Sequence, residues 1–372
     1  MKNIIIFGFG EMGRKLVDEC LDYGIQKRIV AIADNKRTCS EYREIPVIAS
    51  EEISELSFDE MWISTVYHTE IRKQLSEQYG LDTDKMFFVE PVMPILEERI
   101  RIKYKKELLG EVEPTADKKE LVNYMLRHPV RMYCYPFYDE YLFQNTPIYF
   151  DEEKSLYYGF YESKKMYLAR RFNTEQKARA YFNAVLMEQD SRCPHCYWNH
   201  DNMQALSGVG IDVGAAEGIF ALKIIEQVEH IYLAEVAAEW IEALRYTFEP
   251  YQDKVTIVQK FISDEDDEES IRLDTLFENR DIDFIKMDIE GMEYRALQGA
   301  QKLLWHNNVQ LAICVYHHMD DNQQITDWLQ QKGYRTNNSE GFILCQGDWE
   351  LNREETDFRR GLVFANKGGK ER

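Results

Sequence analysis

Short apolar segments alternate with amphipathic ones over the first 90 residues. Buried strands are predicted at NIIIFGFG, RIVAIADN, IPVIAS, EMWISTVYH and KMFFVE, and a helix at EMGRKLVDECLDYG. Strands that alternate with helices form parallel sheets covered on both faces. We therefore predict a small, doubly wound, Rossmann-like α/β domain over residues 1–90.

The pattern changes after residue 90. Charged helices are predicted at EERIRIKYKKELLGE and KKELVNYMLRHP, and an amphipathic helix at EQKARAYFNAVLMEQD. Between them, the alternation in TPIYFDEEKSLYYGFYESKKMYLARRF indicates a β-hairpin or small meander. We interpret residues 91–204 as a helical and aromatic-rich connecting segment that caps the following domain.

A second α/β alternation begins at residue 205. Strands are predicted at SGVGIDVGA, HIYLAEVA, VTIVQKFIS, IDFIKMDI and VQLAICVYH, with FILCQG and GLVFAN as a closing pair. Helical patterns lie between them. Residues 205–372 are therefore expected to form a second Rossmann-like domain around a seven-stranded sheet.

Composition narrows the choice of partners. The formal net charge is −21, whereas nonspecific binding to nucleic acid or anionic lipid needs clustered Lys and Arg. No apolar run approaches the roughly 20 residues that span a bilayer. The seven Cys are scattered, which does not predict a disulfide framework. We expect neither a nucleic-acid nor a membrane partner, and a cytoplasmic location; a homo-oligomer is left open.

The first strand of the second domain leads into a turn of small residues. Asp212 ends the strand, and a helix follows the segment made of Gly214, Ala215, Ala216, Glu217 and Gly218. Small residues let a ligand approach the backbone closely, next to a helix N-terminus. Glu235 ends the next strand, where a carboxylate can accept both hydroxyls of a ribose. A tight turn without a ligand is the alternative for this segment alone.

Acidic residues follow the strand IDFIKMDI. Asp288 lies at its carboxyl end, where a carboxylate is costly to bury without a partner. Glu290 and Glu293 begin the next helix, and for Glu293 we favour a simple interaction with the helix dipole. The acidic run 264–269 is interpreted as a solvated loop.

The segments IDVGAAEGIFAL, YLAEV, LDTLFE, IDFIKMDIEGMEYRAL and AICVYH together resemble the FkbM family of S-adenosylmethionine-dependent methyltransferases. The resemblance covers about residues 205–335. It implies a class I fold and methyl transfer, usually to a hydroxyl of a sugar, glycan or polyketide. It also implies that the cofactor lies against Asp212, Gly214, Ala215, Glu217, Gly218, Glu235, Val236, Phe261, Ile262 and Asp288.

Methyl transfer needs the acceptor atom to be aligned with the methyl carbon and, when the acceptor is a hydroxyl, a general base that removes its proton. His317, Asp288 and Glu290 are the catalytic candidates, with His317 the best placed by pattern. Alternatively, these three side chains bind a divalent cation that lowers the pKa of the acceptor. The family usually has E-x-H here, and Val315 replaces that acid.

The first domain has its own glycine-rich turn. Gly8, Gly10 and Gly13 follow a strand and open a helix, and Asp34 ends the next strand, which is the context of a dinucleotide fingerprint. The domain resembles those that precede sugar-modifying enzymes. This predicts a nucleotide or nucleotide sugar as ligand, with a purely structural domain as the alternative.

The segment RCPHCYWNHDN contains Cys193, His195, Cys196 and His200. A Cys-x-x-Cys pair can form half of a zinc site, but no second pair follows at suitable spacing. We therefore predict no metal site here, and expect Tyr197 and Trp198 to form a wall of the cofactor site.

Taken together, the sequence predicts an O-methyltransferase that acts on a small-molecule or glycan substrate. An NAD(P)-dependent sugar-modifying oxidoreductase, which would use the first domain, is one alternative. The other is a non-catalytic binding protein that keeps the cofactor fold.

Overall fold

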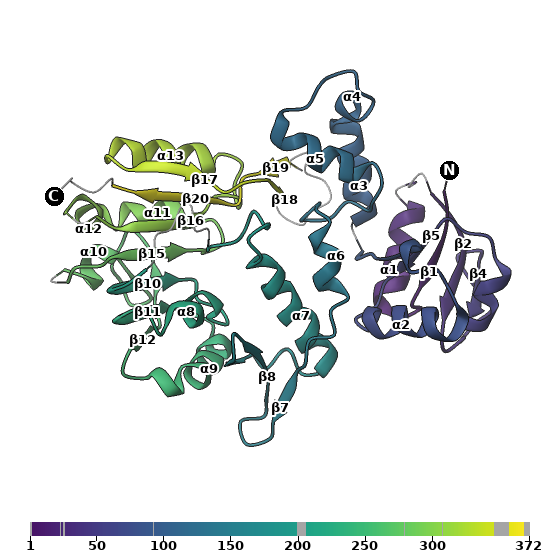
Figure 1. The fold of residues 1–372 in the computed structure, drawn as a ribbon, viewed down its shortest axis with the longest axis horizontal. Helices are drawn as coiled ribbons and strands as arrows, with labels where there is room; N and C mark the ends of the chain where they lie inside the picture. The colour runs from purple at the N-terminus through teal and green to yellow at the C-terminus, as the bar shows by residue number, and fades with distance from the viewer. Residues whose placement is uncertain are drawn as a thin grey trace. The chain divides into compact units, whose positions relative to one another are not determined.

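The computed structural model describes residues 2–22, 24, 27–91, 93–198, 206–278, 280–306, 308–345 and 357–367. The chain folds into two compact units, residues 1–145 and 146–372 (Figure 1). Each unit has its own sheet and its own apolar core.

The first unit is built on a six-stranded sheet with the order β3-β4-β2-β1-β5-β6. Its strands are β1 (Lys2–Phe7), β2 (Lys27–Asp34), β3 (Glu41–Tyr42), β4 (Ile45–Ala49), β5 (Glu60–Ile63) and β6 (Met86–Phe88). All neighbours pair in parallel except β3 and β4. The central strand β1 is apolar from Ile4 to Phe7, because Ile4 and Ile6 enter one apolar cluster and Ile5 and Phe7 another. The predicted Rossmann-like fold is confirmed.

Helices complete the first unit. They are α1 (Glu11–Asp22), α2 (His68–Tyr79), α3 (Met93–Lys103), α4 (Lys105–Leu108), α5 (Ala116–Met125) and α6 (Phe137–Leu142). The buried guanidinium of Arg131 pairs with Asp139 of α6 and donates to the carbonyl of Phe88 at 3.1 Å. The helices that we assigned to a connecting segment, 91–204, thus belong to the first unit up to residue 145, and the rest of that segment belongs to the second.

The second unit contains a seven-stranded sheet with the order β12-β11-β10-β15-β16-β20-β17. The strands are β10 (Val209–Val213), β11 (His230–Ala234), β12 (Val255–Val258), β15 (Phe284–Met287), β16 (Gln310–Cys314), β17 (Arg335–Asn338) and β20 (Leu362–Asn366). The first five run parallel, and β20 is antiparallel to both of its neighbours. The order reverses between β10 and β15, and ligands of doubly wound sheets bind at such a switch point.

One strand of this sheet differs from the prediction. The edge strand is β17, with the sequence RTNN, whereas the predicted strand FILCQG contributes β18 (Ile343–Cys345) to a separate pair with β19 (Asp357–Arg359). All four β17 residues are polar and three of them are exposed, so hydrophobic periodicity gave no signal for this edge strand. The buried β18 has that pattern without belonging to the main sheet.

Helices cover both faces of the sheet: α8 (Ile219–Ile224), α9 (Ala238–Thr247), α10 (Leu273–Leu276), α11 (Glu293–Gln298), α12 (Gln301–His306) and α13 (Asp321–Gln331). Successive residues of β15 enter different cores, since Phe284 packs with Phe220 and Ile285 packs with Leu297. A second small strand pair, β13 (Phe261–Ile262) and β14 (Ser270–Ile271), follows β12.

The predicted hairpin is a three-stranded meander that packs against α9. It consists of β7 (Tyr149–Asp151), β8 (Leu156–Tyr161) and β9 (Lys164–Tyr167), followed by α7 (Glu175–Glu188). The amide of Tyr167 donates to Thr247 Oγ1 at 2.9 Å, and Tyr167 packs in one cluster with Trp240. Phe182 of α7 is fully buried over Gly159, whose missing side chain makes room for the ring.

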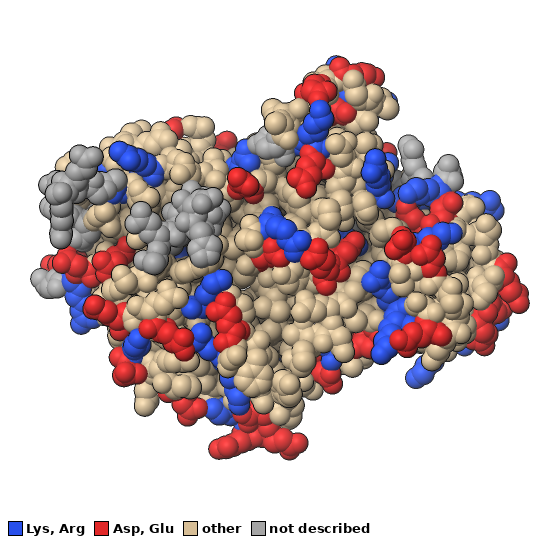
Figure 2. Space-filling model, in the orientation of Figure 1, with Lys and Arg blue, Asp and Glu red and all other residues tan. Residues whose placement is uncertain are grey.

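Among the described residues, none of the helices combines the length and the apolar character needed to cross a bilayer. On the face shown in Figure 2, basic and acidic side chains are interspersed over the surface.

Replacing Phe182 by Ala should destabilise the second unit by about 3–5 kcal/mol, because the fully buried ring leaves a cavity. Phe160→Ala is the matched control, since Phe160 lies on the adjoining strand β8 and is 48% exposed. Urea denaturation followed by circular dichroism measures the free energy of unfolding of both variants. Equal losses in the two variants would contradict this account of the core.

Candidate functional site

The turn after β10 is held close to β15. Gly214 has φ = 78°, and a β-carbon there would lie 1.8 Å from the backbone oxygen of Asp288. Only glycine fits this approach. Gly218 has φ = 81° and packs against Leu244 and Phe248 of the segment around α9. The two predicted glycines are thus required by packing, whatever else the turn binds.

A buried ion pair lies beneath the turn. Asp212 is completely buried, and its carboxylate lies 3.0 Å from Lys286 Nζ. The same ammonium donates to the carbonyl of Gly214 at 2.7 Å. Burial raises the pKa of Asp212, and the charge of Lys286 opposes that shift. Asp212 therefore serves first as the partner of Lys286.

Glu235, directly after β11, binds the turn through its carboxylate. Oε2 accepts from the amide of Ala216 at 3.0 Å, and Oε1 accepts from the amides of Val236 and Ala237 at 2.8 Å each. A carboxylate offers about four lone-pair sites, so these three bonds do not exhaust it. The remaining lone pairs are available to a ligand in the cavity that Glu235 lines.

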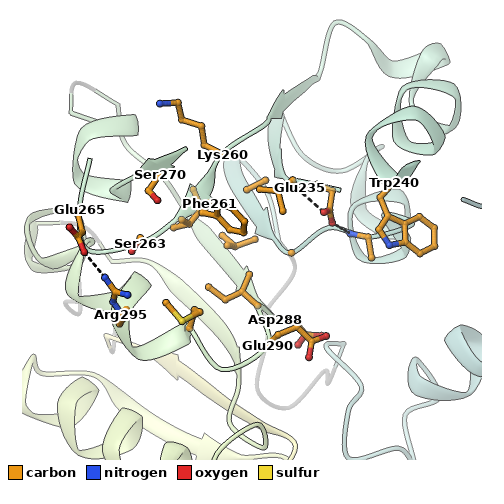
Figure 3. A pocket seen from close by; sticks show the side chains of 18 of the residues that line it. Glu235, Trp240, Lys260, Phe261, Ser263, Glu265, Ser270, Asp288, Glu290 and Arg295 are labelled. Atoms are coloured by element: carbon orange, nitrogen blue, oxygen red, sulfur yellow. Dashed lines mark hydrogen bonds and ion pairs between the residues drawn. The ribbon is translucent and has the colours of Figure 1, made fainter. Parts of the chain in front are cut away.

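A cavity of about 730 Å³ opens in front of Glu235, within the size range of cofactor sites (Figure 3). Six predicted cofactor residues line it: Gly214, Glu235, Val236, Phe261, Ile262 and Asp288. Glu290 lines it as well. The close-up shows Phe261 between Glu235 and the loop that bears Ser263 and Glu265. The structure thus brings together residues from four separate strand ends.

Several lining residues were not predicted from the sequence. They include Trp240 of α9, Lys260, Ser263 and Arg295. Arg295 pairs with Asp264 and Glu265 at 2.7 Å each, so part of the acidic run is neutralised at the cavity rim. The sequence contained no local signal for these residues, which reach the cavity from three separate places: Trp240 from α9, Lys260 and Ser263 from the segment 260–270, and Arg295 from α11.

A smaller cavity of about 210 Å³ adjoins the first, sharing Gly214, Ala216, Asp288 and Glu290 with it. The remaining predicted cofactor residues Asp212, Ala215 and Glu217 line this second cavity. Gly218 is not among the lining residues of either. The polar wall also includes Tyr181, Glu188, Gln189, His195, Tyr197 and Tyr316.

Asp288 lies between two histidines. Its Oδ2 accepts from the hydroxyl of Tyr197 at 2.5 Å and lies 3.4 Å from His195 Nε2, and its Oδ1 lies 3.5 Å from His317 Nε2. Burial alone would raise the pKa of Asp288, but bonding to His195 and the charges of His195, Lys286 and His317 hold it well below its usual range. Asp288 is therefore ionised, and it is the shared anion of the site.

The three catalytic candidates are adjacent. His317 Nε2 lies 3.6 Å from Glu290 Oε2, in addition to its approach to Asp288. Burial lowers the pKa of His317, but Glu293, Asp288 and Glu290 together raise it above its usual value. The dipole interpretation of Glu293 is incomplete, because Glu293 is 0% exposed and its Oε1 lies 3.1 Å from His317 Nδ1.

The Cys-Pro-His-Cys segment contributes its histidine and its tyrosine to this network. His195 Nε2 lies 3.2 Å from the hydroxyl of Tyr316 and 3.8 Å from Cys314 Sγ. Cys196 instead donates to the carbonyls of Gln189 and Trp198 at 3.4 Å each. His200 lies outside the described residues. The sequence had assigned His195 no role at Asp288.

Some of these side chains lie close enough together to hold a metal ion. Within the part of the chain that the structure describes, the compact groups are His195, Asp288 and Cys314, and Asp288, Glu293 and His317. Neither group includes Cys193 or Cys196. In the second, the closest approach of Asp288 is to Nε2 and that of Glu293 is to Nδ1, so the two acids lie nearest to different nitrogens of the His317 ring.

In the first unit, the glycine-rich turn is tied to β2. Gly8 has φ = 108°, and a β-carbon on Gly13 would lie 1.7 Å from the carbonyl oxygen of Gly8. A β-carbon on Gly10 would point into open space. Asp34 accepts from the amides of Phe9 at 2.6 Å and Lys36 at 2.7 Å. These contacts explain the glycines and the acid by the shape of the turn.

Two parts of the chain match known protein families. Residues 191–336 match the family described as the methyltransferase FkbM domain, and residues 1–87 match the family described as C2185-like, N-terminal. No curated protein matches the chain.

Solved structures similar to the chain include the methyltransferase FkbM from Methylobacillus flagellatus KT, with 16% identity over 98% of this chain and 90% of that one, and a TM-score of 0.47. A putative methyltransferase from Streptococcus mutans in complex with SAH has 15% identity over 43% of this chain and 88% of that one, with a TM-score of 0.29. Precorrin-6y C5,15-methyltransferase from Geobacter metallireducens GS-15 has 15% identity over 43% and 80%, with a TM-score of 0.31.

The buried Glu217 should make stability depend on pH. Burial raises its pKa from 4.5 to about 7, although the hydroxyl of Tyr181 donates to it at 2.6 Å. Because the folded carboxyl holds its proton more tightly than the unfolded one, stability should fall as the pH rises from about 4.5 to 7, by up to about 3 kcal/mol. Below that window the contribution is constant.

Urea denaturation at several pH values tests this. Glu217→Gln keeps the shape without the charge, so it should be more stable than the wild type at pH 7 and equal to it near pH 4. Glu226→Gln, in which an exposed acid is replaced, is the control and should follow the wild type. Parallel curves for wild type and Glu217→Gln would contradict the proposed burial cost.

Proposed function

We propose, on the premise that residues 191–336 are an FkbM-family methyltransferase domain that uses S-adenosylmethionine, that the chain methylates a hydroxyl oxygen of a sugar or glycan. The observation that carries the proposal is the close approach of His317 to Asp288, the carboxylate that lines both cavities beside the glycine-rich turn. A histidine with an adjacent carboxylate is the arrangement that removes a proton from a hydroxyl.

The residues of the larger cavity suit the cofactor. Gly214 would line the cofactor with its backbone, Glu235 would accept the ribose hydroxyls, and Phe261 and Ile262 would flank the adenine. Asp212, Ala215, Glu217 and Gly218 would shape the methionine end, and Val236 the ribose end. When bound, S-adenosylmethionine supplies a methyl carbon on a positively charged sulfur.

The chain's own part in the reaction is alignment and proton removal. His317 Nε2 would accept the hydroxyl proton of the acceptor as its oxygen forms the bond to the methyl carbon and the carbon–sulfur bond breaks. Asp288 and Glu290 flank Nε2 and would stabilise the imidazolium that results. The proton is thus held on His317 until it passes to water.

The smaller cavity supports an acceptor with several hydroxyls. Beside the groups assigned to the methionine end, its wall includes Tyr316, Gln189 and Glu188, whose side chains can donate and accept hydrogen bonds. A sugar offers both kinds of partner around one ring. The acidic lining disfavours an acceptor that carries phosphate or carboxylate groups.

Two finer points belong to the same proposal. The first unit would bind a nucleotide or nucleotide sugar at the turn formed by Gly8, Gly10 and Gly13, next to Asp34. The chain would work in the cytoplasm, because all seven of its Cys are free thiols and such thiols persist in a reducing compartment.

Calorimetric titration with S-adenosylhomocysteine should give binding, and Glu235→Ala should weaken it by at least tenfold because the acceptor of the ribose hydroxyls is lost. Glu242→Ala, an acid on the neighbouring helix α9 that pairs with Arg170, is the control and should bind normally. Titrations with NAD and with UDP-glucose separate the alternatives. No heat from S-adenosylhomocysteine at about 100 μM protein, with heat from NAD, would favour the oxidoreductase instead.

His317→Ala should lower methyl transfer to a panel of monosaccharides and oligosaccharides by about 10²–10⁴-fold, because the general base is lost. Labelled S-adenosylmethionine measures the transfer, and S-adenosylhomocysteine affinity should stay within about threefold. His230→Ala is the matched control, since His230 bonds to Thr256 at the far end of β11. Full turnover in His317→Ala would remove this residue from the chemistry, and transfer to amines alone would refute O-methylation.

A further inference from the structure

Glu293 is a buried acid that the proposed reaction leaves unused. It begins α11, is 0% exposed, and its Oε1 accepts from the amide of Ile289 at 2.8 Å. An acid that served the helix dipole alone could remain in water, whereas burying an ionised carboxylate costs several kcal/mol unless it is paired. The cost indicates that Glu293 has a specific partner.

That partner is His317, whose ring nitrogens face different acids. Nδ1 lies 3.1 Å from Glu293 Oε1, and Nε2 lies 3.5 Å from Asp288 and 3.6 Å from Glu290. The ring is about nine-tenths buried and packs on Tyr316 with centroids 4.2 Å apart. Its position is therefore fixed, and the location of its single proton in the neutral form decides what Nε2 can do.

The acids around the ring compete for this proton. Asp288 and Glu290 favour a proton on Nε2, which would block that nitrogen from accepting another. Glu293 favours a proton on Nδ1 and is closer than either of them. Glu293 is also the more buried, with its side chain 1% exposed against 18% for Asp288 and 94% for Glu290, so its interaction is the least screened by water.

We infer that Glu293 is a positioning residue that holds neutral His317 in the Nδ1–H tautomer and leaves the lone pair of Nε2 on the side of Asp288 and Glu290, the two acids that line the cavity. The inference rests on the proposed function only in one respect, namely that the lone pair of Nε2 accepts the proton of the acceptor hydroxyl. The tautomer itself is a property of the chain without any acceptor. Second carboxylates that orient a histidine in this way are common in acid–base sites.

The experiment is ¹⁵N NMR of the full chain labelled at its eight His, with the His317 signals identified by their loss in His317→Ala. Above the raised pKa of His317 and up to about pH 10, the nitrogen shifts report which atom of the neutral ring carries the proton. The wild type should show Nδ1–H. Glu293→Gln should move the proton to Nε2, because the acids on that side then have no competitor, whereas Glu293→Asp should retain Nδ1–H in part.

Glu290→Gln is the matched control, since it removes an acid at similar distance from the other nitrogen and should leave Nδ1–H in place. In turnover, Glu293→Gln should lower kcat by about 100-fold, with S-adenosylhomocysteine affinity within threefold and partial recovery in Glu293→Asp. A wild-type ring protonated on Nε2, or a tautomer unchanged in Glu293→Gln, would overturn the inference even if Glu293→Gln folds poorly. A tautomer shift together with unchanged kcat would instead overturn the role of His317 as base, which belongs to the proposed function.

Discussion

The ion pair between Asp212 and Lys286 is the contact on which the second unit's site depends. One ammonium group on β15 binds both the carboxylate that ends β10 and the carbonyl of Gly214 in the turn that follows. Both charges are almost fully buried, so the loss of either partner leaves the other uncompensated, at a cost of about 3–5 kcal/mol. The turn is thereby fixed against β15, close enough that only glycine fits at 214. Asp288 follows directly on the same strand, so one polar contact sets the distance between the cofactor turn and the proposed catalytic acid.

Much of this architecture follows from local sequence pattern, and the rest does not. The strand ends at Asp212, Glu235 and Asp288 could be placed because a parallel sheet brings its carboxyl ends to one edge. The contact of Tyr197 with Asp288 spans 91 residues, and nothing in the segment around Cys193 and Cys196 indicates it. Likewise, the sequence shows that Glu293 is in a first helical turn but not which way that turn faces. The polar edge strand β17 has no apolar alternation. The sequence pattern therefore predicted the apolar segment of β18 as the strand of the main sheet instead.

The two units use the same device at their first turns. In the first, Asp34 at the end of β2 accepts the amide of Phe9, and in the second, Glu235 at the end of β11 accepts the amide of Ala216. In both, a glycine with positive φ opens the turn, at Gly8 and at Gly214. A carboxylate at this position therefore has a structural reason to be there, because it holds the turn after the neighbouring strand in shape. Binding a ribose, as proposed for Glu235, would be an additional use of a group that the turn already needs.

It follows that the glycine-rich turn and its acid do not by themselves determine the chemistry of a unit. In the second unit the distinguishing groups come from elsewhere: Phe261 from β13, Asp288 after β15, and His317 after β16, with Glu293 behind it on α11. β15 and β16 are parallel neighbours, so Asp288 and His317 meet at one edge of the sheet although 29 positions separate them along the chain. Val315 stands where the resemblance predicts an acid, two positions before His317. Its side chain is buried in the core on the opposite side of the strand from Cys314, so it does not interfere with the contact between Asp288 and His317. The carboxylates that contact His317 are supplied by Asp288, Glu290 and Glu293 instead, from the segment that contains the family's most distinctive motif.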